Sequence, residues 1–264
     1  MKYISLFLLF FSVCTYGQQK MNWPQHKKAV IVLTYDDALG SQLDIAIPQL
    51  NAAHLKATFF LTGYLTPASI PRWRAVAARG YELANHTLYH PCLGKELKGT
   101  SESSTNSYTV FSIVREIGMM NNLLFAIDGK QTRTYAYPCT ETKVAGVSYV
   151  DSLRKSGLVK YARIGGDERD MITDFKKLDP LLVPSWGVSE KTSGVKLIAF
   201  VKKVEEAGGM GIFMFHGIGG DYLTTSADAH KELVQYLQQH RADILVMTFQ
   251  QAMDYVTEAS KKTP

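Results

Sequence analysis

Short runs of β-branched and aromatic residues alternate along the chain with longer segments whose apolar residues recur at helical spacing. This alternation is typical of parallel strands joined by crossover helices. The predicted strands are Ala29–Thr34, Ala57–Thr62, Tyr81–Asn85, Arg133–Tyr137, Lys160–Ile164, Leu181–Trp186, Gly211–Phe215 and Ile244–Thr248. The predicted helices are Gln42–Ala53, Ile70–Arg79, Ser107–Ile127, Lys143–Gly157, Gly194–Ala207, Ala227–His240 and Gln250–Ala259. We therefore expect an α/β fold in which seven or eight mainly parallel strands form a closed or nearly closed barrel.

Composition narrows the class of protein further. Of the 264 residues, 46% are hydrophobic and 20% are charged, which excludes a disordered chain. The formal charge of +5 comes from basic residues scattered along the chain, so no nucleic-acid partner is expected. Nothing in the sequence indicates a particular oligomeric state. The polar segment Gly94–Asn106 is predicted to be a long surface loop.

The first 17 residues have the pattern of a secretory signal peptide. Lys2 precedes the apolar run Ile4–Val13, and cleavage is expected after the small residue Gly17. The run has about half of the roughly 20 residues that a membrane-spanning helix needs, so no membrane span is expected. A lipid anchor on Cys14 is the alternative. Val13 argues against it, because lipoprotein signals usually carry a small residue before the cysteine.

Cleavage after Gly17 leaves residues 18–264, which we expect to form one domain that is secreted or periplasmic. Removal of Lys2 lowers the formal charge from +5 to +4. Two cysteines, Cys92 and Cys139, remain in an oxidising compartment, where they either form a disulfide or stay as small buried thiols. Both alternatives stay open, because the sequence does not give the distance between their Cα atoms.

Polar side chains follow four of the predicted strands, at the edge where a parallel sheet gathers its chemistry. Two adjacent carboxylates at such an edge repel each other in a dry pocket, so a nearby cation or a raised pKa on one of them is expected. The residues in question are Asp36 and Asp37 after the first strand, His86 and His90 after the third, Cys139 after the fourth and His216 after the seventh.

The two histidines and one carboxylate make a candidate metal site. His86 and His90 are four residues apart, a spacing that places both imidazoles on one face of a helical turn. Two histidines and one carboxylate leave positions open for water and a substrate oxygen, and zinc suits these ligands. The plainer alternative is a capping Asp-Asp pair and two surface histidines.

These motifs resemble those of the polysaccharide deacetylases, the chitin, peptidoglycan and chitooligosaccharide deacetylases of carbohydrate esterase family 4. The family motif Thr-Phe-Asp-Asp is similar to Thr34-Tyr35-Asp36-Asp37, and His-Ser/Thr-x-x-His is intact as His86-Thr87-Leu88-Tyr89-His90. The last motif, a hydrophobic residue, any residue and His, corresponds to Met214-Phe215-His216. The resemblance spans nearly all of residues 18–264. It implies a distorted (β/α) barrel that removes N- or O-linked acetyl groups from an acetylated glycan.

The resemblance also implies a role for each matched residue. Asp36 is the expected general base, His216 the expected general acid, and the backbone N–H of Cys139 the expected oxyanion donor. The expected cofactor is a divalent metal, zinc before nickel or cobalt, held by Asp37, His86 and His90.

The middle motifs depart from the family pattern. Its Arg-x-Pro-Tyr corresponds to Ala136-Tyr137-Pro138-Cys139, so the arginine that holds the base is missing. The aspartate of the family's Asp-Trp pair, which holds that arginine, is replaced by Ser185. Losing both partners avoids leaving one buried charge unpaired. We predict that Arg163 reaches Asp36 instead, with Arg133 as the second candidate and a surface position of Arg163 as the alternative.

Three further residues are candidates for substrate contact. Tyr137 and Trp186 are expected to stack on sugar rings, with burial in the core as the alternative. Asp221, in the Gly-rich loop after His216, is expected to orient that histidine, to contact substrate, or only to shape the loop. The remaining histidines are expected to be surface or helix residues without partners, namely His26, His54, His230 and His240.

Two other functions are compatible with the missing arginine and aspartate. One is a carbohydrate-binding relative of the deacetylases that has lost turnover. The other is an esterase of small or plant-derived acetates. Because an alkoxide leaves with less help than an amine, a weakened acid–base pair impairs amide hydrolysis more than ester hydrolysis.

Overall fold

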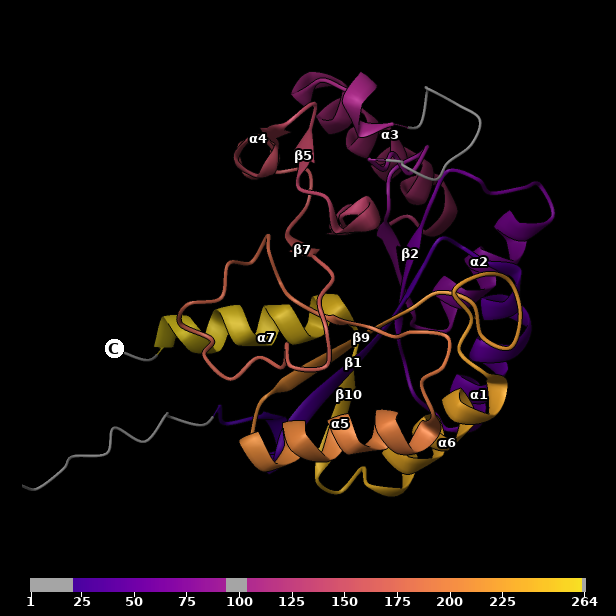
Figure 1. The fold of residues 1–264 in the computed structure, drawn as a ribbon, viewed down its shortest axis with the longest axis vertical. Coiled ribbons are helices and arrows are strands. Elements are labelled where there is room, and N and C mark those ends of the chain that lie inside the picture. The colour runs from indigo at the N-terminus through magenta and orange to yellow at the C-terminus, as the bar shows by residue number, and fades with distance from the viewer. Residues whose placement is uncertain (1–20, 94–103, 263–264) are drawn as a thin grey trace, which may run out of the picture.

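The computed structural model describes residues 21–93 and 104–262 (Figure 1). The predicted signal peptide and most of the predicted loop Gly94–Asn106 lie outside these residues. In Figure 1 the strands β1, β9 and β10 cross the middle of the molecule, with α5 and α6 below them and α3 and α4 at the top. Helices therefore surround a central sheet, as crossover connections between parallel strands require.

The central sheet has eight strands, and every pairing within it is parallel. Its main path runs in the order β7-β4-β3-β2-β1-β9-β8, and β10 pairs with β1. The strands are β1 (Ala29–Asp36), β2 (Thr58–Leu61), β3 (Glu82–Asn85), β4 (Thr134–Ala136), β7 (Tyr161–Arg163), β8 (Trp186–Gly187), β9 (Met210–Phe215) and β10 (Ile244–Met247).

The sheet curls into a distorted barrel, as the sequence predicts. Val183 forms a parallel bridge with Arg163 at the end of β7, and the same segment continues into β8, which pairs with β9. The path of neighbouring strands thus returns to β1. The distortion lies at β1. β9 pairs along one edge of this strand, whereas two strands share the other edge: β10 pairs with residues 29–32 and β2 with residues 34–36.

The helices agree with the predicted ones except in one segment. They are α1 (Ile47–Ala52), preceded by a π-helical turn at Gln42–Ala46, α2 (Ser69–Ala78), α3 (Val110–Asp128), α4 (Val150–Ser156), α5 (Gly194–Ala207), α6 (Ala227–Gln239) and α7 (Phe249–Lys262). The prediction of a helix over Lys143–Gly157 is wrong in its first half. There β5 (Lys143–Val144) pairs antiparallel with β6 (Val147–Ser148), because Gly146 at φ 79° closes a tight turn.

Side chains of β1 alternate between two parts of the core, which fixes the direction of Asp36. Ile31, Leu33 and Tyr35 pack with the residues of α5 and α6 outside the barrel. Val30 and Val32 pack with Phe60 and with buried residues of α7 on the interior side. Because strand side chains alternate with a period of two, Asp36 lies on the interior side with Val30 and Val32.

His230 corrects one expectation, since it is fully buried on α6 rather than a surface or unpartnered residue. Its Nδ1 lies 2.6 Å from Oε1 of Gln49, and its Nε2 lies 2.6 Å from the hydroxyl of Tyr35. The side-chain nitrogen of Gln49 donates to the carbonyl of Ala227, so the atom of Gln49 that faces His230 is the oxygen Oε1, which only accepts. Nδ1 of His230 therefore donates, and Nε2 accepts the Tyr35 proton.

Among the described residues, α3 is the one helix long and apolar enough to cross a bilayer by length and composition. In the fold it contacts β3, α2 and α4. Ile113, Ile117 and Met120 are buried in these contacts. Its apolar face therefore serves the core of the domain.

Candidate active site

Seven predicted site residues meet at the carboxyl ends of the barrel strands, namely Asp36, Asp37, His86, His90, Tyr137, Cys139 and His216. Each either ends a strand or follows one, and parallel strands direct these ends to the same side of the barrel. They surround a cavity of about 940 Å³. Its lining includes Asp36, Asp37, His86, His90, Tyr137, Cys139, His216, Tyr222 and Leu223.

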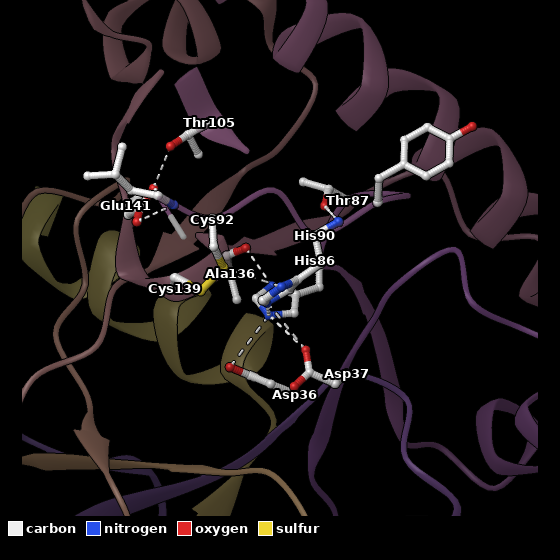
Figure 2. The surroundings of a disulfide bond; sticks show 12 residues. Asp36, Asp37, His86, Thr87, His90, Cys92, Thr105, Ala136, Cys139 and Glu141 are labelled. Carbon is white, nitrogen blue, oxygen red and sulfur yellow. Dashed lines mark hydrogen bonds and ion pairs between the residues drawn. A yellow bond between two sulfur atoms is a disulfide. The ribbon is translucent and has the colours of Figure 1, made fainter. Parts of the chain in front are cut away.

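Asp37, His86 and His90 place one ligand atom each around a common point (Figure 2). Oδ1 of Asp37 lies 3.4 Å from Nε2 of His86 and 3.4 Å from Nε2 of His90. The two Nε2 atoms are 3.1 Å apart. Oδ1 of Asp37 is buried and accepts no hydrogen bond within the described chain. A buried carboxylate oxygen and two imidazole nitrogens in this arrangement fit a divalent cation.

The two histidines do not share a helical turn, which corrects the geometric part of the prediction. The chain from His86 to His90 is irregular, with φ of 65° at Thr87 and 49° at His90. Hydrogen bonds stabilise this turn: Thr87 N–H donates to Asn85 Oδ1 at 2.8 Å, and His90 N–H donates to Thr87 Oγ1 at 2.9 Å. The left-handed residues reverse the chain and bring the imidazoles together.

The hydrogen bond of His86 sets its tautomer. Nδ1 lies 2.8 Å from the carbonyl oxygen of Ala136, which only accepts, so Nδ1 carries the proton. Nε2 is then unprotonated in the neutral ring and faces Asp37. This is the form in which an imidazole binds a metal.

The charges at this point favour a cation. Burial by itself raises the pKa of Asp37, but the neighbouring His86, His90 and His216 outweigh it and lower that pKa well below its usual value. Burial lowers the pKa of His86, yet the carboxylates of Asp36 and Asp37 outweigh burial and raise it. Burial and the adjacent His86 lower the pKa of His90 to about 4. Asp37 is therefore ionised and His90 neutral, the forms in which each binds a cation.

Arg163 contacts Asp36 as predicted. Its Nη2 lies 2.5 Å from Oδ2 of Asp36, and both side chains are almost fully buried. Its Nη1 donates to Oγ of Ser185 at 3.1 Å, and that hydroxyl donates to the carbonyl of Ile164 at 2.8 Å. Ser185, which stands where the family has an aspartate, therefore still orients an arginine.

Arg133, the second candidate, lies elsewhere. Its guanidinium forms a bidentate pair with Asp128, at 2.8 and 2.5 Å, and also donates to the carbonyls of Leu83 and Lys130. It stabilises the end of α3 and has no part in the cavity.

His216 enters the cavity from the end of β9. Its Nε2 lies 3.9 Å from Oδ2 of Asp37. Its Nδ1 is buried, and no acceptor or donor for it is found in the described part of the chain. The amide of Gln42 donates to the backbone carbonyls of Asp36 and His216, at 2.5 and 3.1 Å, and fixes the two strand ends relative to each other.

The disulfide is present. Cys92 and Cys139 are bonded, with a Cα–Cα distance of 5.8 Å across a separation of 47 residues. This decides between the two alternatives that the sequence leaves open.

Two predicted substrate contacts need correction. Trp186 is 4% exposed and packs against Phe200 and Phe213, with ring centroids 5.1 and 5.5 Å away, so no ring face is free for a sugar. Tyr137 lines the cavity, but it is 2% exposed and packs edge-on against Tyr135. Burial in the core, the stated alternative, applies to both rings.

Asp221 neither contacts His216 nor lines the cavity. Its Oδ2 accepts the backbone N–H of Ser41 at 2.7 Å. This bond ties the Gly-rich loop to the segment after β1, which is the loop-shaping role that the sequence leaves open.

Two residues of the site were missed. Tyr222, next to Asp221, donates its hydroxyl to Oδ2 of Asp37 at 2.8 Å and lines the cavity. Glu116 on α3 accepts the N–H groups of Leu88 and Tyr89, at 3.0 and 2.9 Å, and so holds the turn between the two histidines. A signal for Glu116 exists, because a carboxylate inside the apolar run 110–128 needs a buried partner. No pattern in the sequence around Tyr222 indicates its contact with Asp37.

Comparison with known proteins agrees with this geometry. A family model described as polysaccharide deacetylase matches residues 24–155, half of the chain. The chain belongs to the polysaccharide deacetylase family. The matched segment contains Asp36, Asp37, His86, His90 and Cys139. No curated protein matches its sequence.

Solved structures show the same fold. A Mycobacterium smegmatis structure assigned to the polysaccharide deacetylases has a TM-score of 0.64 and 18% identity, covering 93% of this chain and 95% of that one. A peptidoglycan deacetylase from Bacillus subtilis has a TM-score of 0.56 and 18% identity, covering 88% and 93%. A family 4 acetyl xylan esterase from Clostridium thermocellum, solved with a cobalt ion, has a TM-score of 0.55 and 16% identity, covering 85% and 90%.

Proposed function

We propose that this member of the deacetylase family is a secreted, metal-dependent hydrolase that removes acetyl groups from a carbohydrate polymer or oligomer. The observation that carries the proposal is one cavity in which Asp37, His86 and His90 converge beside Asp36, a second carboxylate that Arg163 orients. The three candidate metal ligands and the Asp36–Arg163 pair come from distant segments of the chain. An accidental cluster would not supply both a ligand set and an oriented carboxylate.

Asp37, His86 and His90 are the residues that would hold the metal. A divalent cation there, zinc before nickel or cobalt, would supply Lewis-acid polarisation of the acetyl carbonyl and of water. Oδ1 of Asp37, which is buried and accepts no hydrogen bond among the described residues, and Nε2 of His86, which carries no proton in the neutral ring, support this assignment.

Asp36 is the proposed general base. Its Oδ2 is occupied by Arg163, whereas its buried Oδ1 has no hydrogen-bond partner among the described residues. Oδ1 is therefore the oxygen that takes the proton of the attacking water, while Arg163 and Ser185 keep the carboxyl group in place.

His216 is the proposed general acid, which protonates the leaving amine or alkoxide. The backbone N–H of Cys139, which also lines the cavity, is the proposed donor to the oxygen that becomes negatively charged. Among the hydrogen bonds that join different elements of the described chain, none uses this N–H.

An acetyl ester is the second candidate substrate, and a specific observation favours it. Nδ1 of His216, the imidazole that supplies the proton in the proposed reaction, is buried and has no hydrogen-bond partner among the described residues, so no carboxylate accepts a hydrogen bond on that side of the ring. An amine leaving group needs that proton more than an alkoxide does. The expected order of turnover is therefore O-acetyl before N-acetyl substrates.

The proposed location outside the cytoplasm is supported by the Cys92–Cys139 disulfide, since structural disulfides persist in oxidising compartments. Mass spectrometry of the mature protein would test it. A chain beginning at Gln18 is expected, whereas a lipid-modified Cys14 would contradict the proposed cleavage after Gly17.

Acetate release from chitooligosaccharides, acetylated xylan and an aryl acetate, with and without a chelator, tests the activity. Release that zinc restores after chelation is expected from at least one of the three. Asp36→Asn is expected to lower kcat by about 10²–10⁴-fold, and His216→Ala is expected to impair amide hydrolysis most. His26→Ala, at an exposed histidine, is the matched control. Binding of these glycans without release would favour the carbohydrate-binding alternative.

A further inference from the structure

The disulfide joins two loops that carry different parts of the proposed site (Figure 2). Cys92 lies two residues after His90, in the loop that follows β3. Cys139 lies in the turn that follows β4, residues 137–141, which we call the β4 turn. Both cysteines line the cavity, and Sγ of Cys92 is 3.6 Å from Nδ1 of His90. The disulfide is thus part of the wall beside the metal ligand.

The segment around His90 is anchored differently on its two sides. Before His90, Glu116 of α3 accepts two backbone N–H groups of the turn. After His90, the disulfide leads to the β4 turn, and so does the N–H of Leu93, which lies 2.8 and 3.0 Å from the two carboxylate oxygens of Glu141. The third tie is the carbonyl of Cys92, which accepts the N–H of Thr105 at 3.1 Å. Two of the three ties after His90 therefore lead to the β4 turn, and one of them is covalent.

The β4 turn itself has an uncommon backbone. Cys139 and Thr140 both have positive φ, 49° and 62°, although neither is glycine. Such residues persist where surrounding contacts hold them. Two turn hydrogen bonds are present, Thr140 N–H to the carbonyl of Tyr137 and Glu141 N–H to the carbonyl of Pro138. The covalent tie to Cys92 is a further constraint, and it acts on the residue whose N–H is the oxyanion donor of the proposed reaction.

We propose that the Cys92–Cys139 disulfide is a positioning element that sets His90 against the β4 turn, so that the deacetylation site is complete only in the oxidised protein. The inference rests on the proposed function for its catalytic part. Its metal-binding part stands on the placement of His90 alone. Cys139 is exposed, so a small dithiol can reach the bond: it reduces the disulfide to two thiols and is itself oxidised to a cyclic disulfide.

The test compares oxidised wild type, dithiol-reduced wild type and the Cys92→Ser/Cys139→Ser variant. Each is checked for folding by near-ultraviolet circular dichroism. Zinc affinity is measured by competition with a chromophoric chelator after removal of the dithiol under anaerobic conditions. The kcat and KM are measured on the substrate that wild type hydrolyses best. Reoxidation of the reduced sample tests reversibility.

A control separates positioning from general stability. Leu237→Ala removes a fully buried side chain of α6 outside the cavity, and large-to-small core changes lower stability much as loss of a disulfide does. We expect both disulfide-free proteins to be folded, to bind zinc about 10- to 100-fold more weakly, and to lose kcat by a similar factor with a smaller change in KM. Leu237→Ala should have a lower Tm with the zinc affinity and kcat of wild type.

Unchanged zinc affinity in the folded, disulfide-free proteins, with only a lower Tm, would overturn the proposal. Unfolding of both disulfide-free proteins would also overturn it, because the bond would then serve the fold as a whole. If oxidised wild type releases no acetate from any substrate, the proposed function fails, and the zinc measurement still decides whether the disulfide positions His90.

Discussion

Nη2 of Arg163 lies 2.5 Å from Oδ2 of Asp36, although 127 residues separate them in the chain. The two residues end β7 and β1, strands that are four places apart in the sheet but face each other across the barrel interior. A closed barrel thus supplies the arginine from a strand other than the one that carries it in the family motif. The ion pair is buried and hydrogen-bonded, so both charges have partners.

Arg163→Ala is expected to lower kcat far more than it raises KM, because Asp36 loses its orientation but the cavity stays open. It leaves a buried carboxylate unpaired, which typically costs about 3–5 kcal/mol of unfolding free energy. Steady-state kinetics and urea unfolding measure both effects. Ser185→Ala, which removes a single acceptor of the same guanidinium, should cost about 1 kcal/mol. A fully active Arg163→Ala enzyme would contradict the tethering role.

Zinc is expected to stabilise the protein against heat. Zinc at about 100 times its dissociation constant adds about 2.7 kcal/mol to the free energy of unfolding, since it binds the folded chain. His86→Ala should abolish this increase, whereas His54→Ala, at an exposed histidine, should keep it. Differential scanning fluorimetry after chelation and with added zinc measures the shift. An equal shift in His86→Ala would place the metal elsewhere.

Tyr222→Phe is expected to weaken zinc binding by about tenfold. The hydroxyl donates to Oδ2 of Asp37 and so leaves Oδ1 as the oxygen that faces the two histidines. Tyr222 is 53% exposed, so the apo protein should unfold at nearly the wild-type temperature. Isothermal titration with zinc tests this, with Tyr236→Phe on α6 as the control. Wild-type affinity in Tyr222→Phe would show that the hydroxyl is dispensable for binding.

His230 is expected to make folding sensitive to acid. Burial lowers its pKa to about 3, whereas an unfolded histidine titrates near pH 6.5. Between these values the unfolded chain binds the extra proton, so the free energy of unfolding falls as the pH drops from about 6.5 towards 3. Urea unfolding at a series of pH values, with chelator, should show a steeper fall in wild type than in His230→Gln. Parallel curves would mean that His230 is protonated in the folded protein.

Part of the site could be predicted because the order of neighbouring residues along the chain determines it. Strand periodicity and the polar residues after each strand give the α/β class and the edge at which Asp36, His86 and His216 gather. Chemistry then limits the candidates for the partner of Asp36. A buried base whose usual arginine is missing needs another cation, and Arg163 is a basic residue near the end of a predicted strand. The segment 143–149 could not be predicted in this way, because its hairpin depends on a two-residue turn inside a helix-like pattern.

The sequence by itself determined the barrel class, the strand ends and the motif residues, because periodicity and spacing are properties of neighbours in the chain. The tertiary structure alone decided which side chains are buried and which distant ones touch. Trp186 became core rather than a sugar platform, Cys92 paired with Cys139, and Tyr222 reached Asp37 across 185 residues. These outcomes depend on how the sheet and its loops pack, because the sequence around a residue does not show which distant residue it contacts.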